Sequence, residues 1–169
     1  MTAKRQRVRT AQRVRSASAR TDRLVPASGL VDDLVRSVSD ERGRPIHVAE
    51  ENLGPKEPSG LWVAGDGVDL IVVPDRIGSS QRTAIICHEV AHILLGHVPL
   101  GVGSDLDGLV ELVAPHVDVS VAKQILGRFS YADDLEAEAE AFGTILVTKL
   151  AERSRRLRIK RDSVSDRLR

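Results

Sequence analysis

The sequence predicts a single α+β domain in which a small antiparallel sheet packs on a helical core. Three observations support this prediction. The chain has 169 residues, enough for one domain with tails. A segment with helical apolar spacing is followed by β-rich runs and then by further helical segments. Aromatic residues make up only 2% of the chain, so Leu, Val, Ile and Ala must build the core.

Charge divides the chain into three parts. Residues 1–27 hold eight basic side chains and one acidic side chain, and residues 149–169 hold nine and three. Residues 28–148 hold eight basic and twenty acidic side chains. Basic tails on an acidic body are typical of contact with nucleic acid or an acidic partner, and equally of solubilising arms or of arms that fold back on the acidic body. We therefore predict a disordered tail over 1–27, a folded domain over 28–150 and a basic helical extension over 151–169.

Composition also bears on the cellular compartment. Cys87 is the only cysteine, which excludes an intrachain disulfide and suits a reducing compartment. No apolar run approaches the roughly 20 residues that span a bilayer. The N-terminus lacks the apolar segment of a secretory signal. The expectation is a cytoplasmic protein that does not enter a membrane.

The first predicted element of the domain is a helix over 28–44. Apolar side chains recur there at the four-residue spacing of one helix face: Leu30, Leu34 and Val38. Ser28 is the expected N-cap, because its hydroxyl can accept a hydrogen bond from a free backbone N–H. Gly43 and Pro45 end the helix.

Strands are predicted next. Residues 45–50 alternate in polarity, and two β-rich runs within 61–74 flank Gly65, Asp66 and Gly67. A turn sequence of this kind between β-rich runs predicts a hairpin. The hairpin either pairs with the backbone of a peptide substrate or has a purely structural role.

Helices are predicted for the rest of the chain. One begins at Ser79 or Ser80 and continues through HEVAHILLGH. Two short helices are expected over 104–116 and 118–127. The last helix begins at Ser130 and continues into the arginine-rich end of the chain. Its apolar side chains are Leu135, Phe142, Leu146 and Leu150.

The segment HEVAH at 88–92 carries the strongest chemical signal. Helix residues four apart share a face, with about 5–6 Å between Cβ atoms, so His88 and His92 can direct imidazole nitrogens at one metal ion. Glu89 lies about 100° further round, where it can act as a general base on a water molecule. The flanks AIIC and ILLGH are apolar, and buried polar side chains without partners cost free energy. The motif predicts a metallopeptidase-type zinc site rather than a helix with incidental polar groups.

A catalytic zinc ion needs a third protein ligand. The candidates are histidines and glutamates further along the chain: His97, His116, Glu136, Glu138 and Glu140. Glu136 and Glu140 share a helix face, so one can bind the metal while the other holds a ligand histidine by its second nitrogen. Glu138 lies about 200° from Glu136 on the helix. It falls on the same side as Phe142, and periodicity alone does not exclude it.

These residues also carry a family resemblance. An HExxH helix followed by a helix with the pattern E-x-E-A-(N or D)-x-F-A resembles the ImmA/IrrE family of metallopeptidases, and the matching run here is EAEAEAFG at 136–143. The resemblance covers about residues 28–150. The segments GRPIHV, PSGLWVA and LGRFSYADDLEAEAEAF are similar to short actinobacterial members, which are often described as toxin components of toxin–antitoxin pairs or as regulators.

The resemblance implies a zincin-like core, Zn²⁺ as the cofactor and Glu136 as the third zinc ligand. Two positions depart from the pattern: Glu140 stands where the family has Asn or Asp, and Gly143 stands where it has Ala. The first departure bears on the expected hydrogen bond from Glu140 to a ligand histidine. The interval from His92 to Glu136 is also longer than the family's, and it accommodates the two short helices.

Two functions follow as expectations. The first is a zinc-dependent endopeptidase, constitutive or latent, that cleaves or regulates a helix-turn-helix repressor or antitoxin; this partner is implied by the resemblance alone. The second is a non-proteolytic zinc-containing regulator or toxin component whose basic tails bind nucleic acid or a partner protein. Glu89 favours the enzyme, because a structural metal site has no need of a base. The tails favour the regulator. Manganese or iron can replace zinc at such a site.

Four further residues are interpreted from their positions. Tyr131 either donates a hydrogen bond to a tetrahedral oxyanion or packs at the start of the last helix. His97 suits the negative end of the metal helix. Cys87 is expected to be buried and inert, and Trp62 to lie in the core.

Overall fold

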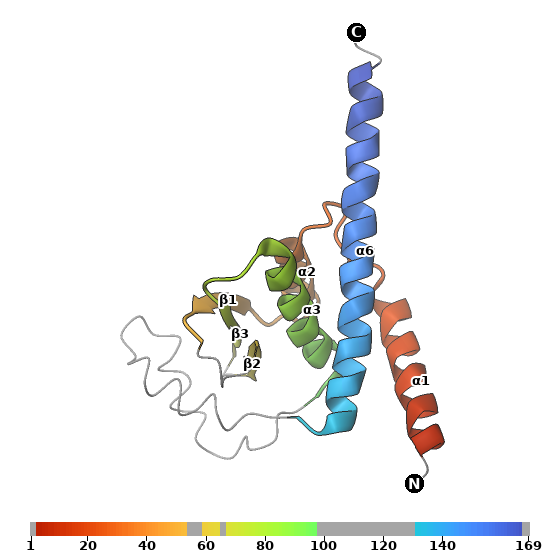
Figure 1. The fold of residues 1–169 in the computed structure, drawn as a ribbon, viewed down its shortest axis with the longest axis vertical. Helices are drawn as coiled ribbons and strands as arrows, with labels where there is room; N and C mark the ends of the chain where they lie inside the picture. The colour runs from red at the N-terminus through yellow and green to blue at the C-terminus, as the bar shows by residue number, and fades with distance from the viewer. Residues whose placement is uncertain (1–2, 54–58, 65–66, 98–130, 167–169) are drawn as a thin grey trace.

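A computed structural model describes residues 3–53, 59–64, 67–97 and 131–166 of the chain. Over these residues the chain forms one α+β domain, as predicted. Figure 1 shows the sheet on one side, α3 between the sheet and the long helix α6, and α1 along the outer side of α6. The short helices expected over 104–116 and 118–127 lie outside the described residues.

The sheet has three described strands: β1 (Ile46–Glu51), β2 (Leu61–Ala64) and β3 (Asp69–Pro74). Their order is β1-β3-β2, so β3 is central. The hairpin prediction is confirmed, because β2 and β3 pair antiparallel. β3 occupies the centre because its residues from Asp69 to Val73 are all buried, as is typical of a strand covered on both faces.

The sheet is mixed, which corrects the expectation of an antiparallel sheet. β1 pairs parallel to β3, with Ile46 opposite Asp69. Asp69 is fully buried, and its carboxylate needs cationic partners there. Arg42 and Arg44 supply them, with Arg44 Nε 2.9 Å from Asp69 Oδ1. Because both arginines precede β1 and Asp69 begins β3, these ion pairs hold the starts of the two strands together and make the pairing parallel.

Helix α2 (Val31–Arg42) begins three residues later than expected. Its N-cap is Leu30, which makes no side-chain cap and is exposed, whereas Ser28 accepts a hydrogen bond from the Leu30 backbone N–H at 3.2 Å. The buried face consists of Val31, Leu34, Val35 and Val38. Gly43 ends the helix in the left-handed conformation (φ 60°), as its position predicted.

Helix α3 (Ser79–Leu95) carries HEVAH and, among the described helices, has the largest number of buried side chains. Its N-cap is Gly78 rather than a serine. Its packing on α6 is close at Gly143, where an added Cβ would lie 3.1 Å from His88 Cα and 3.3 Å from His88 N. Cys87 is fully buried, and burial raises the pKa of its thiol to about 12, which agrees with an inert cysteine.

Helix α6 (Asp133–Asp166) contains both the acidic run and the basic extension. Phe142, Leu146 and Leu150 are buried, whereas nearly every described side chain from 151 to 161 is exposed or half-exposed. Figure 1 shows this second half projecting beyond the rest of the domain. Over the described residues the helix continues through the basic stretch to Asp166. None of the helices in the described residues has the length and apolar character needed to cross a bilayer.

The N-terminal segment differs most from its prediction. Residues 3–21 form helix α1 (Ala3–Thr21) instead of a disordered tail. The composition is poor in apolar residues, but Val14 is buried in the main core and Leu24 and Val25 follow it there. Polar contacts with α6 also hold the segment in place: Lys149 Nζ lies 2.9 Å from Ser18 Oγ. The N-terminal segment is therefore ordered by a few apolar side chains in the core and by polar contacts with α6, which its composition alone does not reveal.

Candidate metal centre

Three side chains from two helices converge on one point. His88 and His92 lie one turn apart on α3, and Glu136 comes from the first turn of α6. The two Nε2 atoms are 3.0 Å apart, and Glu136 Oε2 lies 3.2 Å from His88 Nε2 and 3.8 Å from His92 Nε2. His92 is fully buried, whereas Glu136 is about half exposed. The three form a group that can hold a metal ion.

The spacing of these atoms matches a tetrahedral centre. Zinc bonds of about 2.0–2.1 Å at tetrahedral angles place neighbouring ligand atoms roughly 3.3–3.4 Å apart. The three observed separations of 3.0, 3.2 and 3.8 Å scatter about that value. Two imidazole nitrogens and one carboxylate oxygen also leave a fourth position open, as catalytic zinc sites do. The donor set and its geometry therefore fit the ion that the sequence predicted.

The three glutamates considered for the third ligand position lie in different places. Glu136 is in the metal group, and Glu138 is turned into the core. The Glu140 side chain is 77% exposed, and its Oε2 is 3.7 Å from His88 Nδ1. That separation is too long for a hydrogen bond, so Glu140 lies near His88 without making the predicted hydrogen bond to a ligand histidine. His116 lies outside the described residues.

The second nitrogen of His92 has a partner that the sequence did not indicate. His92 Nδ1 lies 3.0 Å from His97 Nδ1, and His97 Nε2 lies 3.2 Å from Glu138 Oε2. His97 is nearly fully buried, so its predicted role of a cation at the helix end does not describe its contacts. Two features of the sequence could have indicated that Glu138 and His97 are buried near the metal helix: Glu138 shares a helix side with Phe142, and His97 directly follows the helix-ending Gly96.

The turn after α3 explains how His97 reaches His92. Gly96 is left-handed (φ 67°), its N–H bonds to Ile93 O, and the His97 N–H bonds to His92 O at 3.0 Å. This pair of bonds is the Schellman ending of a helix, which folds the chain back over the last turn. The glycine thus places the His97 ring against the ring of His92, with their centroids 5.0 Å apart.

The imidazole of His92 is in the uncharged form that a metal ligand requires. Burial first, and then the charges of His88 and His97, lower the pKa of His92 to about 3. At neutral pH the imidazole is therefore uncharged, which is the form that binds metals. The Tyr131 ring stacks on it, with centroids 3.7 Å apart and an angle of 19° between the planes.

Glu89 lies beside the three ligands but is not one of them. Its side chain is buried. This burial and, after it, the negative charge of Glu136 raise the pKa of Glu89 to about 8, against the lowering effect of a hydrogen bond with the Trp62 backbone. Strand β2 approaches it closely, since a Cβ added at Gly60 would be 3.2 Å from Glu89 Oε1. A carboxyl group with a pKa near neutrality can both accept and return a proton.

Two buried polar atoms among the described residues have no hydrogen-bond partner there: Trp62 Nε1 and the Tyr131 hydroxyl. Trp62 belongs to the main core, as predicted. The Tyr131 pKa is raised by burial and then by the charges of Glu89 and Glu136, so this hydroxyl lies within the electrostatic reach of both. A buried donor without a partner next to a candidate metal centre is available to a bound molecule.

Comparisons of the chain with protein-family models, with curated proteins and with solved structures found no match. What the fold and the site define is an α+β protein with a His-His-Glu group able to hold a metal ion.

Proposed function

We propose that this protein is a zinc-dependent metallo-endopeptidase of the ImmA/IrrE type. The observation that carries the proposal is the buried carboxyl of Glu89 next to the group formed by His88, His92 and Glu136. A structural metal site needs ligands only, whereas hydrolysis needs a base that is close to the ion and does not bind it. The tetrahedral spacing of the three donor atoms supports zinc.

The roles of the side chains follow from their positions. Bound zinc would acidify a water molecule and polarise the carbonyl group of the substrate. Glu89 accepts the proton of the attacking water and then gives it to the leaving amine, for which a pKa near neutrality is suited. The Tyr131 hydroxyl donates a hydrogen bond to the developing oxyanion. His88, His92 and Glu136 hold the ion in place.

The position of β2 supports a peptide as the substrate. β2 is an edge strand of the described sheet, and Gly60 and Trp62 place its start beside Glu89. An extended peptide can pair with an edge strand through main-chain hydrogen bonds, which brings its backbone to the catalytic groups. The resemblance to ImmA/IrrE proteins makes a helix-turn-helix repressor or antitoxin the proposed physiological partner.

Metal removal tests the proposed function directly. We expect the purified full-length protein to cleave members of a proteome-derived peptide library, detected by mass spectrometry. Treatment with a chelator should abolish the cleavage, and added Zn²⁺ should restore it, because the ion supplies the acidic water. Cleavage that continues at the same rate after verified metal removal would contradict the proposal.

The Tyr131 hydroxyl provides a narrower test. The substitution Tyr131→Phe keeps the ring that stacks on His92 and removes only the unpartnered donor. We expect kcat to fall by about 10²-fold, the lower end of the range for one oxyanion donor. KM and zinc affinity should stay within a few-fold of wild type. An unchanged kcat would make Tyr131 a packing residue only.

The projecting half of α6 favours a second candidate function. Arg155, Arg158 and Arg161 are exposed there, on the half of α6 that projects beyond the rest of the domain (Figure 1). A basic exposed helix can neutralise phosphates of nucleic acid. The second candidate is therefore a regulator that binds nucleic acid through α6, with or without hydrolysis at the metal centre.

A salt-dependent gel shift on double-stranded DNA separates this candidate from the first. If α6 binds DNA, replacing Arg155, Arg158 and Arg161 with Gln should weaken binding and reduce the slope of log affinity against log salt by about 2–3. Arg36→Gln and Arg76→Gln change exposed arginines elsewhere and should have no effect. Absence of a shift by wild type at low salt, or an unchanged slope in the triple variant, would exclude DNA binding by α6.

A further inference from the structure

Arg13 of α1 is connected to the metal centre through two buried side chains. Its guanidinium Nη1 lies 2.9 Å from Glu138 Oε2, and its Nη2 donates to Leu95 O at 3.2 Å, at the end of α3. Glu138 contacts His97, and His97 contacts the ligand His92. The chain of contacts therefore runs from the N-terminal helix to the metal site without a gap longer than 3.2 Å.

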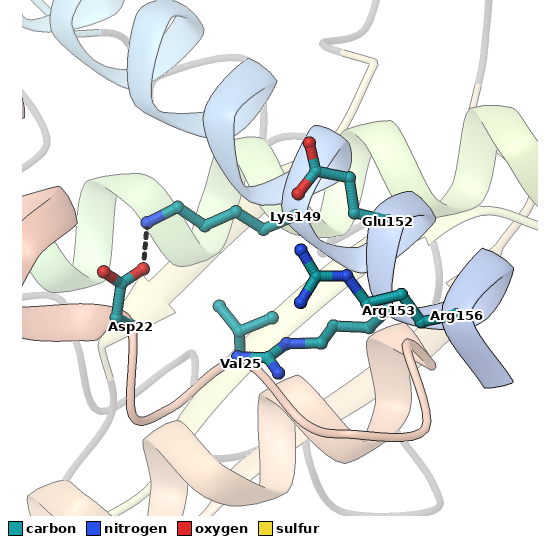
Figure 2. Close-up of a pocket in the computed structure, with 6 residues that line it drawn as sticks. All are labelled: Asp22, Val25, Lys149, Glu152, Arg153 and Arg156. Atoms are coloured by element: carbon teal, nitrogen blue, oxygen red, sulfur yellow. Dashed lines mark hydrogen bonds and ion pairs between the residues drawn. The ribbon is translucent and has the colours of Figure 1, made fainter.

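Helix α1 is held in the position that this contact requires. Lys149 of α6 reaches across to Ser18, and its ammonium is also ion-paired with Asp22. Figure 2 shows that ion pair at the rim of a small pocket between α6 and the loop after α1. Val14 lies one residue from Arg13 and is buried in the main core. The part of α1 that follows Arg13 is thus anchored to the main core and to α6.

The hydrogen-bond directions in the chain follow from the ligand role of His92. If its Nε2 binds the ion, its Nδ1 must carry the proton, and it donates that hydrogen to His97 Nδ1. His97 then carries its own proton on Nε2 and donates it to the Glu138 carboxylate. Arg13 ends the chain of contacts, because its guanidinium lies 2.9 Å from the same Glu138 oxygen that accepts from His97.

We infer that Arg13, Glu138 and His97 are positioning residues of the metal centre, and that α1 contributes to the centre through Arg13. This inference rests on the proposed metal site. A ligand histidine needs a partner on its second nitrogen, which sets both its tautomer and the orientation of its ring. In most such sites one carboxylate or carbonyl accepts the hydrogen bond from the second nitrogen of the ligand histidine. Here the imidazole of His97 accepts it, the carboxylate of Glu138 accepts from His97, and Arg13 of α1 is ion-paired with that carboxylate.

The test measures metal affinity and coordination in the full chain. Zinc affinity comes from competition with a chromophoric chelator, and coordination comes from the visible spectrum of the Co²⁺-substituted protein. We expect Arg13→Gln and Glu138→Gln each to lower zinc affinity by about 10–100-fold, the range for partners of ligand histidines, and to alter the Co²⁺ spectrum. Arg13→Lys keeps the charge and should retain most of the affinity.

Two matched controls separate positioning from general stability. Arg15→Gln removes an exposed arginine two residues away on the same helix and should leave affinity and spectrum unchanged. Ser18→Ala removes one of the contacts that anchor α1 but leaves Lys149 paired with Asp22, so it should lower the melting temperature and leave the Co²⁺ spectrum unchanged. His97→Phe should reproduce the loss, and combining it with Arg13→Gln should add little, because both act through His92.

The outcomes distinguish this inference from the proposed function. If wild type binds zinc and cleaves peptides, but Arg13→Gln keeps its affinity and its Co²⁺ spectrum, the positioning role is wrong and the peptidase proposal stands. If affinity falls equally in Arg13→Gln and Arg15→Gln, the effect is one of net charge and the inference fails. If wild type binds no zinc, both proposals fail.

Discussion

Glu89→Gln is expected to abolish peptide hydrolysis while zinc remains bound. The amide has the shape of the carboxylate but cannot accept a proton, so kcat should fall by about 10²–10⁴-fold, the usual contribution of a general base. Zinc affinity should stay within a few-fold of wild type, because Glu89 lies outside the group formed by His88, His92 and Glu136. The measurements are cleavage kinetics on a library peptide and chelator competition. Full activity in this variant would rule out the proposed mechanism.

The pH dependence of the stability of the metal-free protein provides a second, independent test of Glu89→Gln. The folded-state pKa of Glu89 is raised to about 8, mainly because the side chain is buried. Between its unfolded pKa and this value the folded protein binds more protons than the unfolded chain, so stability falls as pH rises. The slope is at most about 1.4 kcal/mol per pH unit. In Glu89→Gln the decrease in stability that comes from the titration of Glu89 should be absent. Urea unfolding at several pH values, in the presence of a chelator, measures it.

The second large effect is expected at Glu136. Glu136→Gln replaces a charged ligand with a weak neutral one, and zinc affinity should fall by more than the roughly 100-fold seen for residues that only support a ligand. Activity should be lost with the metal. Glu140→Gln is the matched control, because that side chain is 77% exposed and only loosely paired with His88. It should change zinc affinity by no more than a few-fold.

Glu138→Gln is expected to fall between these two variants, since Glu138 acts through His97 and not on the ion. The ranking of the three glutamates is thus a prediction in itself. A larger loss at Glu138 or Glu140 than at Glu136 would mean that the third ligand has been assigned to the wrong residue. Each variant keeps the size of the side chain, so differences in packing do not enter the comparison.

The parts of the site that could be predicted from the sequence are those set by helix geometry. The four-residue spacing of His88 and His92 determines that both lie on one face of α3, whatever the rest of the chain does. The same holds for the side of α6 that carries Glu136. Helix geometry does not determine that these faces of α3 and α6 meet, because their meeting depends on the tertiary fold. The family resemblance predicted it, whereas periodicity did not.

The parts that were missed depend on contacts between distant segments. The pairing of Arg13 with Glu138 joins the first helix to the last described one, and no local pattern encodes it. The parallel pairing of β1 depends on two arginines that precede it and reach Asp69 at the start of β3. Helix α1 was predicted as disordered because its composition was judged without the surface of α6 that orders it.

The docking of α1 on α6 also sets the order in which a newly made chain can acquire its metal centre. Ser18 and Lys149 are 131 residues apart, so α1 leaves the ribosome long before its docking surface does. At about 5–20 residues per second this interval lasts roughly 7–26 s. During most of that time Arg13 is present, but Glu136 and Glu138 have not been made, because both lie close to Lys149 in the sequence. The metal centre would therefore be complete only after α6 has been made, when Glu136 joins His88 and His92.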